Sequence, residues 1–185
     1  MKFNIKDING KELWAKVKAE AHEIYHNPNK KNDDRTLAEI QNTNFYGLAP
    51  EQFLIENCGF HNDPRKYKDV ISPEGHAVEI KTTTARGVRG MLNKCDHWKE
   101  YVHYRKMPEW VFVFECEASW NRISSTHNVI VDSGPQYELQ GTYQWNGQSY
   151  VDKAFPWKSE ANTAISMHED ELWLANPVWA VKHNA

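Results

Sequence analysis

The first 60 residues carry the hydrophobic spacing of α-helices. Between Gly10 and Tyr25, apolar residues recur about every 3.6 positions and charged residues fill the other faces, which predicts an amphipathic helix. The pattern also predicts a short helix over residues 34–41. A further helix is expected to begin near Pro50 and to end at Gly59, because proline suits a first helical turn and glycine a C-terminal cap.

From residue 67 the pattern changes to that of β-strands. Two runs, residues 67–71 and 76–82, flank the turn sequence Ser72-Pro73-Glu74-Gly75, which predicts a hairpin with a three-residue loop. A helical stripe follows over residues 91–106. The apolar run from Trp110 to Phe114 shows no alternation, which predicts a strand buried on both faces.

More β-structure is expected after Trp120, where Asn146-Gly147 between two strand-like runs is a strong hairpin signal. No repeat, low-complexity tract or linker divides the 185 residues. The order of elements therefore predicts one mixed α/β domain. We expect a central mixed β-sheet flanked by helices, with extra C-terminal β-structure.

Composition and charge narrow the class of protein. Net charge is −3, from 22 basic and 25 acidic residues, so no global positive field attracts nucleic acid. A local basic face on the protein could still bind nucleic acid. The longest apolar run is too short to span a bilayer, and the N-terminus lacks the apolar region of a signal peptide. Three widely spaced cysteines without a CxxC pair favour reduced thiols. We therefore expect a cytoplasmic protein with no membrane association.

The predicted hairpin brings charged side chains together. A three-residue loop sets a register in which Asp69 lies opposite Glu79, with β-carbons roughly 5 Å apart. Lys81 lies on the same face, because strand side chains alternate. The register depends on Gly75, since a two-residue loop would shift the pairing by one residue.

Two opposed carboxylates repel each other unless a cation compensates their charge. Their hard oxygen atoms favour Mg²⁺, and the Lys81 ammonium can hold a phosphate or orient an attacking water. Asp69, Glu79 and Lys81 on one sheet face therefore indicate metal-dependent phosphodiester hydrolysis. The alternative is an ion-pair ladder on an exposed sheet, without chemistry of its own.

The spacing of these residues resembles a known signature. Asp69, nine further residues and the triplet Glu79-Ile80-Lys81 resemble the motif of the PD-(D/E)XK nuclease superfamily. Lys68 stands where that family usually has a proline. The resemblance implies a restriction-endonuclease-like core in which Asp69 and Glu79 bind Mg²⁺ and Lys81 is catalytic.

An upstream segment extends the resemblance. Gly47-Leu48-Ala49-Pro50-Glu51 is similar to the family's first-helix pattern, in which a glutamate often joins the metal site. This implies Glu51 as a further catalytic residue and metal ligand, with Glu56 as its rival. The core then covers residues 47–116. Residues 1–46 form a helical N-terminal part and candidate dimer surface, and residues 117–185 form β-rich decoration that is a candidate for DNA recognition.

Basic residues crowd the stretch that follows the hairpin. Hydroxyl groups bind phosphate oxygens, and glycine lets the backbone approach them closely. We therefore expect nucleic-acid contacts from Thr82, Thr83, Thr84, Arg86, Arg89 and Lys94. The alternative is a solvated loop and helix face.

Together, the residues and the resemblance imply a Mg²⁺-dependent, sequence-specific endonuclease acting on double-stranded DNA. Such a small chain resembles a type II restriction enzyme, which would act as a homodimer so that two sites face the two strands of a symmetric target. A structure-specific, repair or phage nuclease of the same superfamily would use the same residues. A non-catalytic nucleic-acid-binding module is the alternative of another class.

Overall fold

The computed structural model describes residues 1–27, 34–63, 69–83, 107–117, 120–123, 126–129 and 136–157. Its helices are the 3-10 helix η1 (Ile5–Asp7) and the α-helices α1 (Gly10–Tyr25) and α2 (Leu37–Cys58). The strands are β1 (Lys2–Asn4), β2 (His61–Asn62), β3 (Val70–Ile71), β4 (Ala77–Thr83), β5 (Trp110–Glu117), β6 (Trp120–Ile123), β7 (Thr126–Val129), β8 (Gln136–Trp145) and β9 (Tyr150–Asp152). Within the described ranges, no helix is both long and apolar enough to cross a membrane.

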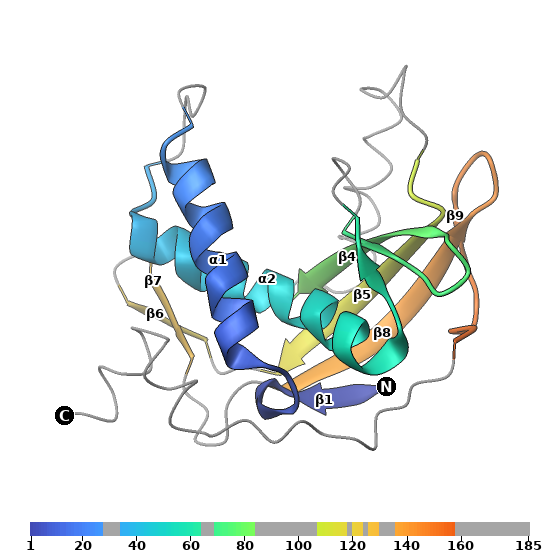
Figure 1. Ribbon diagram of the computed structural model, residues 1–185, viewed down its shortest axis with the longest axis horizontal. Helices are drawn as coiled ribbons and strands as arrows, with labels where there is room; N and C mark the ends of the chain where they lie inside the picture. The colour runs from blue at the N-terminus through green and yellow to red at the C-terminus, as the bar shows by residue number, and fades with distance from the viewer. Residues whose placement is uncertain are drawn as a thin grey trace.

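One curled mixed sheet organises the chain. Its strands follow the order β1-β8-β5-β4-β3-β2, and β9 pairs with β8 (Figure 1). β4 and β5 are parallel, whereas the other neighbouring strands are antiparallel. β6 and β7 form a separate two-stranded sheet. The predicted mixed α/β class, with a mixed sheet and helices beside it, is confirmed.

Helix α1 has the bounds that the apolar spacing predicts. The Asn9 side chain caps its start by accepting hydrogen bonds from the Lys11 and Glu12 N–H groups, at 3.1 and 3.3 Å. Leu13 and Val17 are fully buried on the face that packs toward α2 and the sheet. This packing fixes which side chains of α1 lie beside the site.

Helix α2 differs from the prediction. We expected two helices, over residues 34–41 and from Pro50, but one continuous helix runs through Pro50 to the left-handed Gly59, whose φ is 71°. A proline inside a helix costs about 3 kcal/mol. The helix contacts α1 and β4, and full burial of Ala49 and Leu54 offsets that cost. The helix crosses residues 46 and 47, so the expected N-terminal part and core share one element.

The β3–β4 hairpin has the predicted register. The Ser72 N–H donates to the His76 carbonyl at 2.8 Å, and the Gly75 N–H donates to the Ser72 carbonyl at 2.9 Å. Gly75 adopts a φ of 88°, which closes the loop. Val70 lies opposite Val78, as the three-residue loop requires. The strand expected from residue 67 is seen from Val70, and residues 64–68 lie outside the described residues.

Strand β5 forms the centre of the core. Its first five residues are all buried, with Phe112 and Phe114 fully inaccessible, which confirms the predicted strand with two covered faces. The expected helix over residues 91–106 lies outside the described residues. The hairpin signal around Asn146 and Gly147 is also confirmed, because β8 and β9 flank a turn in which Gly147 has a φ of 99°.

Candidate active site

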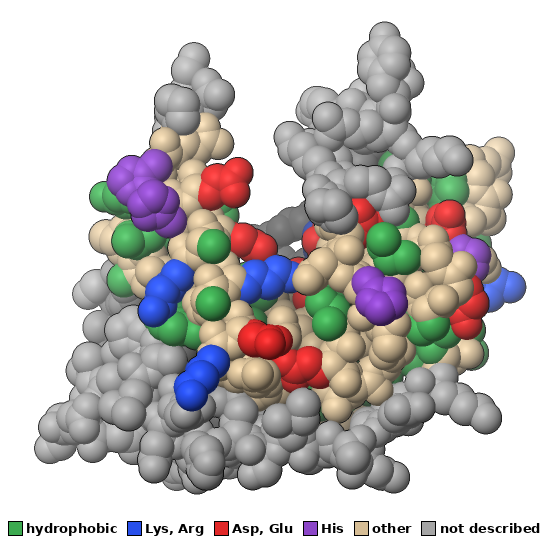
Figure 2. Space-filling view, in the orientation of Figure 1, with side chains coloured by type: hydrophobic (Ala, Val, Ile, Leu, Met, Phe, Trp, Pro, Cys, Tyr) green, Lys and Arg blue, Asp and Glu red, His purple; other side chains and the backbone are tan. Residues whose placement is uncertain are grey.

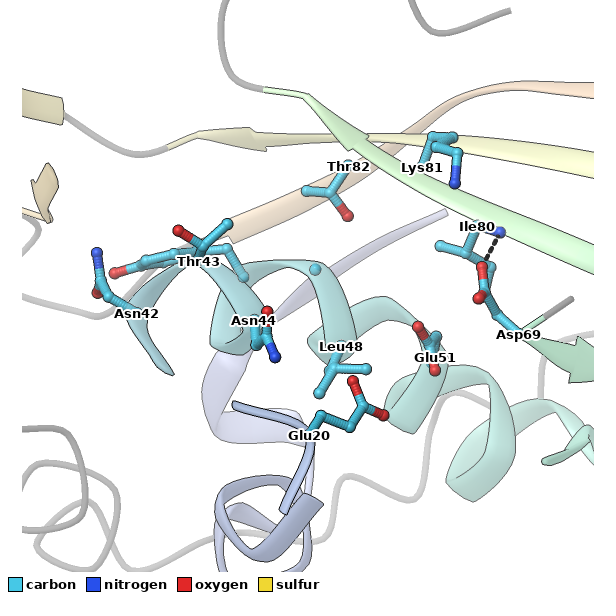
Figure 3. Close-up of a pocket in the computed structure, with 12 residues that line it drawn as sticks. Glu20, Asn42, Thr43, Asn44, Leu48, Glu51, Asp69, Ile80, Lys81 and Thr82 are labelled. Carbon is cyan, nitrogen blue, oxygen red and sulfur yellow. Dashed lines mark hydrogen bonds between the residues drawn. The ribbon is translucent and has the colours of Figure 1, made fainter. Parts of the chain in front are cut away.

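Asp69 is held against the backbone of β4. Its N–H donates to the Val78 carbonyl at 3.0 Å, and its carboxylate Oδ2 accepts a hydrogen bond from the Ile80 N–H at 2.6 Å (Figure 3). The strand ladder ends at Val70, so the predicted pairing of Asp69 with Glu79 is not part of it, and Asp69 bonds to β4 through its N–H and this carboxylate. The carboxylate is thereby fixed in orientation at the end of the hairpin.

Glu79 and Lys81 lie together on β4. The Lys81 ammonium forms an ion pair with Oε1 of Glu79, whose side chain is only 5% exposed. Oε2 of Glu79 is buried and has no hydrogen-bond partner in the described structure. Val78 and Ile80 point into the core, as the strand alternation predicts. Because Glu79 is buried, this pair is not part of an exposed ion-pair ladder.

Glu51 reaches the same region from α2. Its carboxylate forms an ion pair with the ammonium of Lys16, on α1, at 2.7 Å. Glu56, its rival on the same helix, instead accepts hydrogen bonds from the Asn9 N–H at 3.0 Å and from Gln52 at 2.6 Å. Glu56 therefore ties α2 to the start of α1, and Glu51 is the glutamate of this helix that lies beside Asp69.

Two adjoining hollows meet at Glu51 and Asp69, whereas Glu79 is not among the residues that line either hollow. The hollows have volumes of about 460 and 510 Å³. Both are lined by Glu20, Leu48, Glu51 and Asp69. The first continues past Lys81 to Asn44 and Thr82 (Figure 3). The second continues to Lys16 and Asn62. Figure 2 shows acidic and basic side chains gathered where this face of the molecule is hollowed.

The carboxylates of the site resist ionisation. Burial, and then the charge of Asp69, raises the pKa of Glu51 to about 8 and the pKa of Glu79 to about 7. Burial also raises the pKa of Asp69, although the Lys81 charge opposes this shift. Burial likewise raises the pKa of Glu20. The nearby lysines therefore do not compensate the negative charge fully, and a further cation would stabilise it.

The fit of a metal ion rests on Asp69 and Glu79. In the part of the chain that the structure describes, no three His, Cys, Asp or Glu side chains form a preformed metal site. Mg²⁺ needs fewer protein ligands, because it usually keeps several waters and binds through one or two carboxylates. The fixed carboxylate of Asp69 lines both hollows, and the buried, unpartnered Oε2 of Glu79 would complete the ligand set once its side chain turns toward Asp69.

The predicted nucleic-acid contacts have different positions. Thr82 lines the first hollow, and its buried hydroxyl has no hydrogen-bond partner within the described ranges. Thr83 is buried and lines neither hollow. The remaining predicted contacts, Thr84, Arg86, Arg89 and Lys94, lie outside the described residues.

Sequence reasoning missed the contribution of α1 to the site. Glu12, Lys16 and Glu20 recur every four residues, so they form one charged stripe along the helix. All three line the second hollow. The four-residue repeat was a visible signal, but only the packing of α1 on α2 shows that the stripe faces Glu51 and Asp69.

No family model, curated protein or solved structure matches this chain.

Proposed function

We propose that this protein is a Mg²⁺-dependent DNA endonuclease. The observation that carries the proposal is the pairing of a fixed Asp69 carboxylate with a buried Glu79 carboxylate whose Oε2 has no partner among the described residues. Both belong to a hairpin that also carries Lys81. Two carboxylates and a lysine in this arrangement suit phosphodiester hydrolysis, because the reaction builds negative charge on phosphorus and needs an activated water.

The residues of the candidate site have distinct roles in this proposal. Asp69 and Glu79 would hold Mg²⁺, which supplies Lewis-acid stabilisation and lowers the pKa of a bound water. Lys81 exchanges its ion pair with Glu79 for a contact with the phosphate, which places positive charge on the reacting group. Thr82 and Asn44 line the first hollow, and their buried, unpartnered donor atoms would bind the neighbouring backbone of the nucleic acid once these side chains turn outward.

The order of elements supports a restriction-endonuclease-like core. The β3–β4 hairpin is followed by β5, which is parallel to β4, and α2 packs against β4 with Glu51 at the site. We infer that the chain acts on duplex DNA in the manner of a small type II restriction enzyme.

Cleavage of DNA by the purified chain tests the proposal. Supercoiled plasmid, a long linear duplex and a branched junction are each incubated with Mg²⁺ or with EDTA. We expect Mg²⁺-dependent conversion of the plasmid to linear DNA and discrete fragments from the linear duplex. Cleavage of the junction alone would favour a structure-specific nuclease with the same residues. Absence of cleavage on every substrate would contradict the proposal and favour a non-catalytic binding module.

A further inference from the structure

Lys16 provides a fixed positive charge in the second hollow. Its ammonium donates to Oε2 of Glu51 at 2.7 Å and to Oδ1 of Asn62 at 3.3 Å. The Lys16 side chain is 24% exposed and the Glu51 side chain 10%, so the pair lies at the boundary between protein and hollow. An exposed surface pair would contribute little, but this pair is shielded from water on one side.

The packing of α1 determines this position. Leu13 and Val17 are fully buried, and Lys16 lies beside this apolar stripe. Lys18, on the same helix, is exposed and lies 5.6 Å from the ring centre of Trp14. The two lysines therefore differ in environment, although both belong to one helix and carry the same charge.

The charge of Lys16 reaches three carboxylates. Its ammonium opposes the rise in the pKa of Glu51, Asp69 and Glu20, which burial causes. All three side chains line both hollows. A cation bound between Glu51 and Asp69 would therefore bind carboxylates whose negative charge the Lys16 ammonium already balances in part.

In many phosphodiesterases two divalent cations, about 3.5–4 Å apart, stabilise the attacking and leaving oxygens. We propose that the Lys16 ammonium takes the place of the second cation beside Glu51, so that the site binds one divalent cation, through Asp69 and Glu79. The inference rests on the proposed function. It makes Glu51 the residue that positions Lys16, in contrast to the metal ligand that the sequence resemblance implies.

Titration with Mn²⁺ tests the inference by a readout other than cleavage. Binding to the full chain is measured by electron paramagnetic resonance and by calorimetry, without DNA and at pH 9, because the pKa of Glu51 is raised to about 8 and its carboxylate must be ionised to bind a cation. We expect about one Mn²⁺ per wild-type chain and about two per chain in Lys16→Met, where Glu51 has lost its cation. Lys18→Met is the matched control and should bind as the wild type does. The double variant Lys16→Met/Glu51→Gln should return to about one Mn²⁺ per chain, because the second ligand is gone.

A second variant keeps the test informative if Lys16→Met does not fold. Glu51→Gln should keep about one Mn²⁺ per chain, with affinity within a few-fold of wild type, whereas loss of a direct ligand would remove a metal–oxygen bond and weaken binding by about tenfold or more, or about 1.4 kcal/mol. Two Mn²⁺ per wild-type chain, or a tenfold loss in Glu51→Gln, would overturn the role of Lys16 and leave the proposed nuclease intact. No Mn²⁺ binding by the wild type at millimolar concentration would instead contradict the proposed function itself.

Discussion

Burial makes the carboxylates of the candidate site costly to ionise. Glu51 and Glu79 release their protons near pH 8 and 7, whereas both would do so near 4.5 without burial and neighbouring charge. Between these values the folded protein therefore holds more protons than the unfolded chain. Folding and ionisation are then opposed at neutral pH unless a cation is bound.

The stability of the metal-free protein should consequently fall as pH rises from about 5 to about 8. Thermal unfolding in EDTA, followed across this range, measures the slope. Glu51→Gln should flatten it, because the amide has no proton to lose, and Mg²⁺ should raise the melting temperature most at pH 8. Glu56→Gln, outside the hollows, is the control. A melting temperature that rises between pH 5 and 8 in EDTA would contradict this explanation.

Lys81 should matter for catalysis more than for binding of the metal. Lys81→Ala removes the positive charge that the proposal places on the phosphate, so cleavage should fall on the order of 10² or more. Mn²⁺ should still bind, because the carboxylates of Asp69 and Glu79 remain. Lys18→Ala is the control for loss of one positive charge. Wild-type cleavage by a folded Lys81→Ala protein would remove Lys81 from the mechanism.

At the scale of elements, the β3–β4 hairpin carries most of the site. Gly75 holds a φ of 88°, and a β-carbon at this position would meet no atom within 4 Å. A larger residue at position 75 would therefore strain the backbone conformation but would not clash with neighbouring atoms. Gly147 offers the same conditions in the β8–β9 hairpin, with a φ of 99° and open space around it.

This pair of glycines makes a matched experiment. Gly75→Val and Gly147→Val should each lower the free energy of unfolding by about 1–2 kcal/mol, because both force a β-branched residue into the left-handed region. Cleavage should fall strongly in Gly75→Val alone, since only that hairpin orients Asp69 against β4. Urea unfolding and plasmid cleavage are measured on both variants. Equal cleavage by the two would show that the turn does not set the geometry of the site.

Sequence patterns predicted a helix, turn or strand correctly where neighbouring residues alone determine it. The apolar stripe of α1, the hairpin turn at Gly75 and the buried run of β5 all have local causes in spacing or turn chemistry. The continuous helix through Pro50 was not predictable in this way, because only burial between α1 and the sheet offsets the cost of the proline. Strand β1 was missed for the same kind of reason, since it is three residues long and pairs with the distant β8.

The candidate site likewise contains residues that the local sequence predicted and residues that only tertiary packing brings to it. The motif placed Asp69, Glu79 and Lys81 on one hairpin, because their spacing and the turn are contiguous in sequence. Lys16 required the packing of α1 on α2, which no local pattern contains. Burial of Glu79 also depends on distant elements, and it explains why a pair that looks like a surface ladder in sequence is enclosed in the structure.

At the scale of the whole molecule, cleavage of both strands at a symmetric target calls for two active sites. We therefore predict that the chain is a homodimer, with the N-terminal helical part as the candidate contact surface. Sedimentation velocity at micromolar concentration measures the assembly, with and without duplex DNA. A chain that stays monomeric while it cuts both strands at full rate would contradict this prediction.

The central claim is that Asp69 belongs to a metal-dependent cleavage site. The most direct measurement compares wild type and Asp69→Asn in two assays, plasmid cleavage in Mg²⁺ and a DNA gel shift in Ca²⁺. Asp34→Asn, an exposed aspartate outside both hollows, is the control. We predict that Asp69→Asn loses cleavage and still binds DNA, because it removes a metal ligand and a negative charge from the site. Cleavage by folded Asp69→Asn at the wild-type rate would contradict the account.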